Sequence, residues 1–201
     1  MLDLRLPDGF LTFDETAHEY RLEGQPVPSV TQVLQLIDSF EGVPLDVLEA
    51  AREFGQHVHH AVELDSKGEL DEDSLDPALA EYVAGWRKFL SDREATVLAS
   101  EARVCDPRLR YAGTLDSLVS IGGKTWLIDV KSGAIPTGTV GPQTAAYLHA
   151  LHACWPGAFP RAMPRGCVQL KPNDYRFVWL RDSRDWNVFL SALNIHQWRN
   201  T

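Results

Sequence analysis

The stretch Trp126-Leu-Ile-Asp-Val-Lys-Ser-Gly133 decides the fold, and the rest of the chain is best understood outward from it. Its apolar first half predicts a β-strand over about 124–131. Asp129 directly follows three large apolar residues, where an ionised carboxylate is costly unless it is paired or binds a cation. Asp129 and Lys131 are two residues apart, so their side chains lie on the same face of this strand.

A second strand is expected just before it, over about 111–121, and the Gly122-Gly123 pair between the two favours a hairpin turn. Asp116 on this strand reaches the face of Asp129 if the register permits. Two carboxylates so placed make a hard oxygen site that suits Mg²⁺ or Mn²⁺. The simpler interpretation is an Asp–Lys ion pair at a strand end, with Asp116 in a turn.

The remaining chain alternates between helical and strand periodicity. It predicts a single α/β domain over 1–201, with a central mixed sheet, helices on both faces and a helical N-terminal part. Residues 1–94 form that N-terminal part, and 95–201 form the sheet with its flanking helices. The expected further elements are a hairpin over Phe10–Leu22 that Pro26 and Pro28 end, a short helix capped by Ser29, helices over about 45–65 and after Pro77, a loop over Ser66–Asp76, a strand over about 97–105, a helix over about 142–153, strands near 165–171 and 175–181, and a helix over about 184–198.

The composition narrows the class of protein. With 44% hydrophobic and 23% charged residues among 201, the chain is typical of a soluble globular domain with one substantial core. The N-terminal residues lack the apolar core of a signal peptide, and no uncharged run approaches membrane-spanning length. We therefore expect a cytoplasmic protein without a membrane partner. Cys105, Cys154 and Cys167 are too widely spaced to predict a disulfide framework or a paired cysteine metal site.

Charge is distributed unevenly along the chain. The net charge of −9 by itself argues against a nucleic-acid enzyme, because the phosphate backbone favours Lys and Arg. Residues 1–100, however, hold 7 Lys and Arg against 21 Asp and Glu, whereas residues 101–201 hold 12 against 7, a balance of −14 followed by +5. An acidic half is usually a solvated surface, but this asymmetry is also what one electropositive working face would produce.

Four short motifs occur in a fixed order around the central strand. They are Gly55-Gln-His-Val-His59, Gly113-Thr-Leu-Asp116, Asp129-Val-Lys131-Ser132-Gly133 and Gln143-Thr-Ala-Ala-Tyr147, and Pro28-Ser-Val-Thr-Gln32 stands before them. In these motifs and their order the sequence resembles the PD-(D/E)XK nuclease superfamily, in its RecB-like and phage-type exonuclease branch. The resemblance covers about residues 26–150 and implies a restriction-endonuclease-like core.

The resemblance assigns roles to the polar residues of these motifs. It implies that His59, Asp116 and Asp129 bind Mg²⁺ or Mn²⁺, with the backbone carbonyl of Val130 as a further ligand. Lys131 would orient the attacking water or stabilise the negative charge that develops during hydrolysis.

Some nearby polar residues have weaker assignments. Glu101 matches the first acidic position of the superfamily, where it would bind a second ion or help to position the site. Glu63, one helical turn beyond His59, could hydrogen-bond the imidazole ring or be solvated. His57 and His60 point away from the face of His59, and we expect them on the surface.

Four residues are candidates for substrate contact. Gln143 and Tyr147 lie one helical turn apart and could contact the scissile nucleotide or orient Lys131, although ordinary helix packing explains them equally well. Gly113 permits close approach of the substrate to the backbone, or serves as a strand entry. Ser132 begins a flexible loop whose amides could meet phosphates, or which only connects to the next helix.

The residues and the resemblance together predict a metal-dependent DNA nuclease. The resemblance implies an exonuclease acting at DNA ends in recombination, repair or phage DNA processing. A structure-selective endonuclease with the same site is one alternative, and a catalytically silent DNA-end-binding module is another. Three scattered cysteines provide no ligand set for the iron–sulfur cluster of some members, and no phosphate loop for a nucleotide cofactor is present. The expected partners are single- or double-stranded DNA ends and a recombination or single-strand-binding protein, in the host cytoplasm if a phage encodes the chain.

Overall fold

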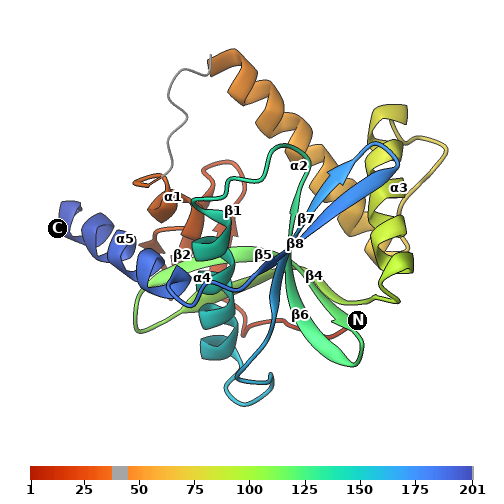
Figure 1. Ribbon diagram of the computed structural model, residues 1–201. Helices are drawn as coiled ribbons and strands as arrows, with labels where there is room; N and C mark the ends of the chain where they lie inside the picture. The colour runs from red at the N-terminus through yellow and green to blue at the C-terminus, as the bar shows by residue number, and fades with distance from the viewer. Residues whose placement is uncertain (38–44, 201) are drawn as a thin grey trace.

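A five-stranded mixed sheet forms the centre of the protein in this computed structural model, which describes residues 1–37 and 45–200 (Figure 1). The strand order is β4-β5-β6-β7-β8; β6 and β7 run parallel, and the other neighbours are antiparallel. The mixed sheet that the sequence predicts is thus confirmed, with strand limits that agree within one residue. The strands are β4 (Thr96–Asp106), β5 (Tyr111–Ile121), β6 (Lys124–Lys131), β7 (Arg165–Lys171) and β8 (Asp174–Leu180).

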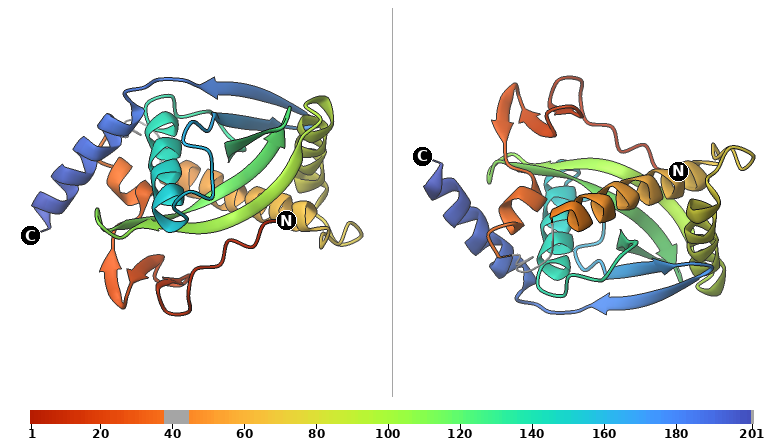
Figure 2. Two further views of the ribbon diagram at one scale, coloured as in Figure 1. Left: turned by 90° about the horizontal axis from the view of Figure 1, so that it is seen from below. Right: turned by 90° about the horizontal axis from the view of Figure 1, so that it is seen from above.

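Helices cover both faces of this sheet, as the sequence predicts. α1 (Val30–Leu34), α4 (Val140–Cys154) and α5 (Asp185–Arg199) share one apolar cluster with the strands, and α2 (Leu45–Lys67) and α3 (Pro77–Asp92) share the other. Figures 1 and 2 show α3 and α4 on opposite sides of the strands. Burial of these apolar side chains is the main stabilising contribution to the fold. The first cluster includes Tyr111, Leu118, Leu127, Leu151 and Phe189, and the second includes Val58, Trp86, Phe89, Ile128 and Val168. Within the two described ranges, no helix is long and apolar enough to cross a lipid bilayer.

Local capping residues set the starts of two helices. Ser29 Oγ accepts the backbone N–H of Gln32 at 3.0 Å, while Gln32 Oε1 accepts the N–H of Ser29 at 2.8 Å. This reciprocal capping box fixes the first turn of α1. Asp76 caps α3, and Pro77 occupies its first turn, as expected. α2 extends to Lys67, so the expected acidic loop begins two residues later than predicted.

The N-terminal segment forms a second, three-stranded antiparallel sheet. Its strands β1 (Leu11–Asp14) and β2 (Glu19–Leu22) confirm the predicted hairpin. β3 (Gln25–Val27) corrects the expectation that Pro26 ends the strands. Pro26 lies opposite Arg21 on an edge strand, where its missing N–H is tolerated. Through Tyr20, Leu22 and Val27 this sheet packs against Cys105 and Ala112 of the central sheet.

Candidate active site

Three carboxylates lie on three neighbouring strands of the central sheet. The β4–β5 register places Glu101 opposite Asp116. The β5–β6 ladder ends one residue before Asp116 and Asp129. There Asp116 Oδ2 accepts the backbone N–H of Val130 at 2.7 Å, and this bond continues the ladder through a side chain. The hairpin register therefore brings Asp116 beside the strand segment that carries Asp129.

Glu101 holds its place in this row with a strained backbone. Its φ of 48° lies in the left-handed region, which a residue with a Cβ seldom adopts. Such a conformation costs on the order of 1 kcal/mol and persists only where the surroundings impose it. The strands around Glu101 therefore hold its backbone in a conformation that a glutamate seldom adopts.

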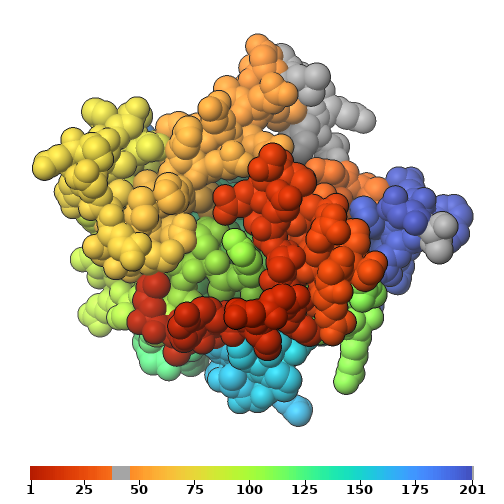
Figure 3. Space-filling view, turned by 180° about the vertical axis from the view of Figure 1, so that it is seen from behind, coloured from red at the N-terminus to blue at the C-terminus, as the bar shows by residue number. Residues whose placement is uncertain are grey.

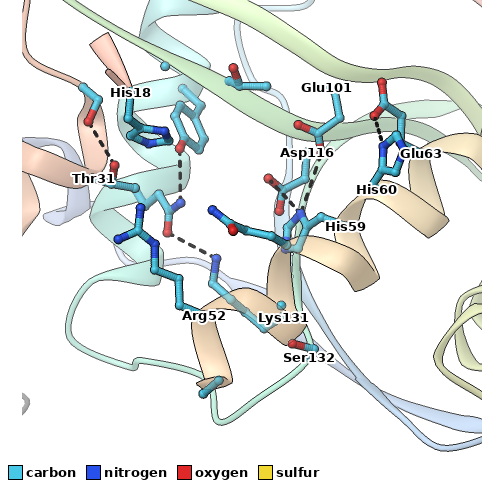
Figure 4. A pocket seen from close by; sticks show the side chains of 18 of the residues that line it. His18, Thr31, Arg52, His59, His60, Glu63, Glu101, Asp116, Lys131 and Ser132 are labelled. Atoms are coloured by element: carbon cyan, nitrogen blue, oxygen red, sulfur yellow. Dashed lines mark hydrogen bonds and ion pairs between the residues drawn. The ribbon is translucent and has the colours of Figure 1, made fainter. Parts of the chain in front are cut away.

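α2 delivers a histidine to the same row (Figure 4). His59 Nδ1 lies 3.7 Å from Glu101 Oε1 and 3.8 Å from Asp116 Oδ1. One turn earlier, a Cβ at Gly55 would lie 3.4 Å from Ser132 Oγ, an ordinary contact distance, so α2 passes close to the loop that follows β6. The Gly-x-x-x-His motif thus lies where α2 passes the end of β6, with His59 facing the carboxylates.

The converging donors form a group that could hold a divalent cation. One atom each from His59, Glu101 and Asp116 lie within 4.8 Å of one another. The sequence assigned Asp129 to this set and gave Glu101 a lesser role, whereas the structure groups Glu101 instead. Asp129 Oδ1 accepts Lys131 Nζ at 2.9 Å, and its Oδ2 accepts the Cys167 thiol at 3.6 Å. Both carboxylate oxygens of Asp129 therefore already accept a hydrogen bond from a protein group.

Lys131 is held between two partners. Its Nζ donates to Asp129 Oδ1 at 2.9 Å and to Gln143 Oε1 at 3.5 Å. Gln143 Nε2 in turn donates to Tyr147 OH at 3.2 Å. Gln143 and Tyr147 are buried on α4, one helical turn apart. These contacts agree with the expectation that the pair orients Lys131, although they also contribute to packing.

Gly113 allows Tyr147 to take this position. A Cβ at Gly113 would lie 2.6 Å from Tyr147 Cε1, so no side chain fits there unless the ring moves. Gly113 is buried, and this contact gives a third explanation for it besides substrate approach and strand entry. The Gly-Thr-x-Asp motif therefore combines a seat for Tyr147 with the carboxylate of Asp116.

Burial and charge shift the pKa values of the cluster. Burial by itself lowers the pKa of His59, but Asp116 and Glu101 outweigh it and raise the pKa to about 9. Burial raises the pKa of Asp129 to about 6 against the opposing effect of Lys131, and it also raises the pKa of Asp116. Burial opposes the charge on Lys131, yet Asp129 and Asp116 raise its pKa. At neutral pH His59 and Lys131 are thus both protonated in the metal-free site, beside the carboxyl groups that three strands supply.

The cluster lines a cavity of about 530 Å³. Figure 3 shows a hollow between the N-terminal segment, in red, and α2, in orange, with strand residues at its floor. Ser132, at the start of the loop after β6, also lines this cavity. Sequence reasoning missed Arg52, His18 and Thr31, which also line it. For Arg52 a signal existed, because it lies on α2 at helical spacing from His59. Thr31 belongs to the Pro28-Ser-Val-Thr-Gln32 motif, to which no site role was assigned, and His18 carries no motif.

Three polar residues of α2 lie close to His59 in the sequence but do not contact its imidazole ring. Glu63 pairs with Lys67 at 2.5 Å and with His60 at 3.5 Å, and no hydrogen bond from the His59 ring to Glu63 is formed among the described residues. His57 and His60 are exposed, as expected. A carboxylate at Glu63 therefore serves the surface of α2 rather than the orientation of the imidazole.

Two solved structures among those similar to this chain come from one source. The crystal structure of LHK-Exo in complex with dAMP is 13% identical, covers 84% of this chain and 85% of that chain, and has a TM-score of 0.43. The crystal structure of an alkaline exonuclease (LHK-Exo) from Laribacter hongkongensis is 14% identical, covers 84% and 88%, and has a TM-score of 0.37. No family model and no curated protein matches the sequence. At such low scores, we base the function on the geometry of the site.

Proposed function

We propose that this protein is a metal-dependent deoxyribonuclease of the PD-(D/E)XK superfamily, RecB-like branch, which hydrolyses phosphodiester bonds at DNA ends. One observation carries the proposal: His59, Glu101 and Asp116 converge within 4.8 Å beside the buried Asp129–Lys131 pair. The simpler interpretation, an ion pair at a strand end, does not account for a helix histidine that faces two carboxylates from neighbouring strands.

The donor set fits Mg²⁺ or Mn²⁺. Glu101 and Asp116 supply hard carboxylate oxygens, and the imidazole of His59 is a somewhat softer ligand that suits Mn²⁺ as well. Val130 could add its backbone carbonyl. When bound, such an ion lowers the pKa of a coordinated water and offsets charge on the phosphoryl oxygens.

Lys131 stabilises the negative charge that develops on the scissile phosphate. Its pKa is raised, so the amine stays protonated, and Asp129 and Gln143 fix its direction. A donor fixed before the reaction is worth more than a mobile one, because it needs no reorganisation in the transition state. Tyr147 holds Gln143 and completes this support.

Arg52 contacts a neighbouring backbone phosphate. It is exposed, lines the cavity, and has no ion pair within residues 1–37 and 45–200. Figure 4 shows its side chain extending along the cavity wall toward Thr31. A free guanidinium and a hydroxyl are suitable donors for one phosphate group. Ser132, on the other side of Lys131, would contact the next part of the strand.

The proposal is tested with purified protein and four DNA substrates: end-labelled single-stranded, linear duplex, nicked circular and closed circular DNA, with Mg²⁺, Mn²⁺ or EDTA. We expect stepwise loss of nucleotides from linear ends, no cleavage of closed circles, and no activity in EDTA. His59→Ala should lose this activity. His57→Ala is the matched control, because it removes the same side chain from an exposed position of the same helix.

The same experiment separates the alternatives. Cleavage of closed circles would identify an endonuclease and overturn the end-specific mode. Retention of DNA ends without hydrolysis under either ion would identify a silent binding module. Hydrolysis that persists in EDTA would contradict the metal dependence.

A further inference from the structure

A second cavity lies at the opposite end of β6, and the proposed function does not use it. Its volume is about 610 Å³. Its walls come from the β5–β6 turn, from the loop before β7 and from β8, and they include Trp126, Met163 and Trp179. Lys124 and Lys131, at the two ends of β6, are seven residue steps apart, which is about 23 Å of extended strand. We call this site the tryptophan cavity.

The walls of the tryptophan cavity expose apolar surface that a protein normally covers. Trp179 is 48% exposed, whereas Trp126 behind it is 8% exposed, and their ring centroids lie 4.9 Å apart. Trp126 Nε1 is buried and has no hydrogen-bond acceptor in the described part of the chain. A large exposed aromatic residue beside an apolar cavity is typical of a surface that receives an anchoring side chain.

Cations surround this apolar surface. Lys124, Arg161 and Arg181 are exposed, and none of them forms an ion pair among the described residues. The residues that line the cavity lie within 123–126 and 160–164 and at Trp179, and none of them is Asp or Glu, although the chain as a whole has a net charge of −9. Asp182, which follows Arg181, pairs with Arg184. The rim is therefore electropositive within an acidic protein, and its charge is complementary to carboxylates.

The arrangement of Trp179 favours a protein ligand over a nucleic acid. The guanidinium of Arg181 lies 3.5 Å from the centroid of the Trp179 ring and covers one face. Trp126 packs against the same ring at an interplanar angle of 57°. A base that binds by stacking needs an open aromatic face. Trp179 instead forms a wall, which suits the insertion of a side chain.

We propose that the tryptophan cavity binds a short acidic segment of a partner protein. One aromatic or branched aliphatic side chain of that segment enters between Trp126, Met163 and Trp179, and its flanking carboxylates pair with Lys124 and Arg161. The apolar anchor supplies most of the affinity, and the charges increase the association rate and select acidic sequences. This site is separate from the catalytic cluster, so the inference does not depend on nuclease activity.

The test is selection of random dodecapeptides displayed on phage against the immobilised full-length protein. We expect enriched sequences that contain an aromatic or branched aliphatic residue flanked by at least two Asp or Glu. Synthetic fluorescein-labelled versions should bind in an anisotropy titration, and replacement of the apolar residue by alanine should weaken binding about tenfold or more. Failure to enrich such sequences would overturn the proposal.

Variants of the protein locate the binding site. The double variant Lys124→Glu with Arg161→Glu should weaken peptide binding about tenfold or more. The matched control is Lys171→Glu with Arg176→Glu, which makes the same charge change on the exposed β7–β8 hairpin and should bind the peptide as the parent protein does. Trp179→Ala should lose binding, with folding checked by thermal unfolding. Equal effects of the two charge reversals would overturn the assignment to this cavity.

Two other occupants give distinct results. If the cavity binds nucleic acid, oligothymidylate and not peptide will lose affinity in Trp179→Ala. If it receives a second copy of this chain, the mass in solution will fall to that of a monomer in the Lys124→Glu, Arg161→Glu variant. Either result would replace the partner segment that we propose. DNA cleavage should be unchanged in both charge variants, because neither alters the catalytic cavity.

Discussion

Two ion pairs, both largely removed from solvent, have opposite surroundings. Arg165 and Asp185 join β7 to α5 with an N–O distance of 2.9 Å, and their side chains are 11% and 13% exposed. Arg165 also donates to Gly141 O at 2.7 Å and to Asp182 O at 3.2 Å. The pair consists of one cation and one carboxylate, and the further hydrogen-bond partners of Arg165 are uncharged oxygen atoms. Because no unpaired charge is left over, we call such a pair balanced. It stabilises the contact between α4, α5 and the sheet.

The Asp129–Lys131 pair differs because it lies among further carboxylates. Its N–O distance is also 2.9 Å, but Asp129 is only 1% exposed and Asp116 and Glu101 lie on the next two strands. Burial raises the pKa of both Asp129 and Asp116, which means that the folded chain tolerates these charges reluctantly. The difference teaches that a balanced ion pair stabilises a fold, whereas an unbalanced one retains the capacity to bind a ligand.

The largest expected effect separates the two pairs by activity. Lys131→Ala should lower the rate of DNA cleavage about a thousandfold, because it removes a fixed positive charge from the developing oxyanion. Arg165→Met should leave the rate per folded molecule unchanged. The measurement is initial cleavage of end-labelled DNA at saturating Mn²⁺, with the folded fraction taken from circular dichroism. A comparable loss of rate in the two variants would remove the distinction.

The second prediction concerns stability, where we expect the Arg165–Asp185 pair to have the larger effect. Asp185→Ala leaves Arg165 without its charge partner, and we expect the free energy of unfolding to fall by about 3 kcal/mol. The check is urea denaturation at pH 7. Asp65→Ala is a suitable control, because it removes another ion-paired carboxylate from the more exposed pair with Arg87 and should cost about 1 kcal/mol or less. A smaller loss for Asp185→Ala than for this control would show that the balanced pair is not structural.

A third expectation concerns the proton that a cation must displace. The folded metal-free protein holds a proton on His59 with a pKa of about 9, above the value of 6.5 for an unfolded chain. Its contribution to stability is therefore complete below pH 6.5 and is lost as pH rises through 9. Below pH 9 a bound cation must expel this proton, so affinity for Mn²⁺ should rise by up to about tenfold per pH unit.

Calorimetry in two buffers of different ionisation enthalpy measures this release directly. At pH 7.5 we expect about one proton per Mn²⁺ ion, since His59 is protonated and Asp129 is already ionised. His59→Asn keeps a neutral donor but cannot hold the proton, and its release should approach zero. An unchanged release in this variant would assign the proton to another group.

The smallest effect tests whether the unbalanced pair weakens the fold. Because burial raises the pKa of Asp116, its contribution to stability is present below the unfolded value of 3.8 and is lost at higher pH. Asp116→Asn replaces the buried carboxyl with a neutral amide and keeps an oxygen for the Val130 N–H. We expect the metal-free variant to gain about 1 kcal/mol, which raises Tm by about 2–4 °C for a chain of this size. Asp185→Asn should lower Tm, and a fall in both would contradict the comparison.

The sequence could predict the central strands and helices because their patterns are local. The apolar run that ends at Asp129, the Gly122-Gly123 turn and the Pro77 helix start all act within a few residues, and the structure follows them. β3 escaped prediction because Pro26 is acceptable only on an edge strand, and its position at the edge depends on the whole N-terminal sheet.

The site was less predictable, since its members meet only through the fold. Asp-x-Lys predicts that Asp129 and Lys131 share a face, but the place of Glu101 depends on the β4–β5 register and on a left-handed backbone. Cys105 and Cys154 are 49 residues apart, and no sequence pattern indicates that their sulfur atoms lie 3.9 Å from each other.

The placement of carboxylates on adjacent strands has a consequence for ion size. Neighbouring strands are about 4.8 Å apart because backbone hydrogen bonds set that spacing, and side-chain substitution does not change it. Glu101 and Asp116 inherit their separation from this repeat. His59 is the one donor of the group that a helix supplies, and side-chain packing, not backbone hydrogen bonding, sets the distance of α2 from the sheet. Attempts to adapt the site to a larger or smaller cation should therefore change the residues through which α2 packs on the sheet, for example near Gly55, and leave the strands unchanged.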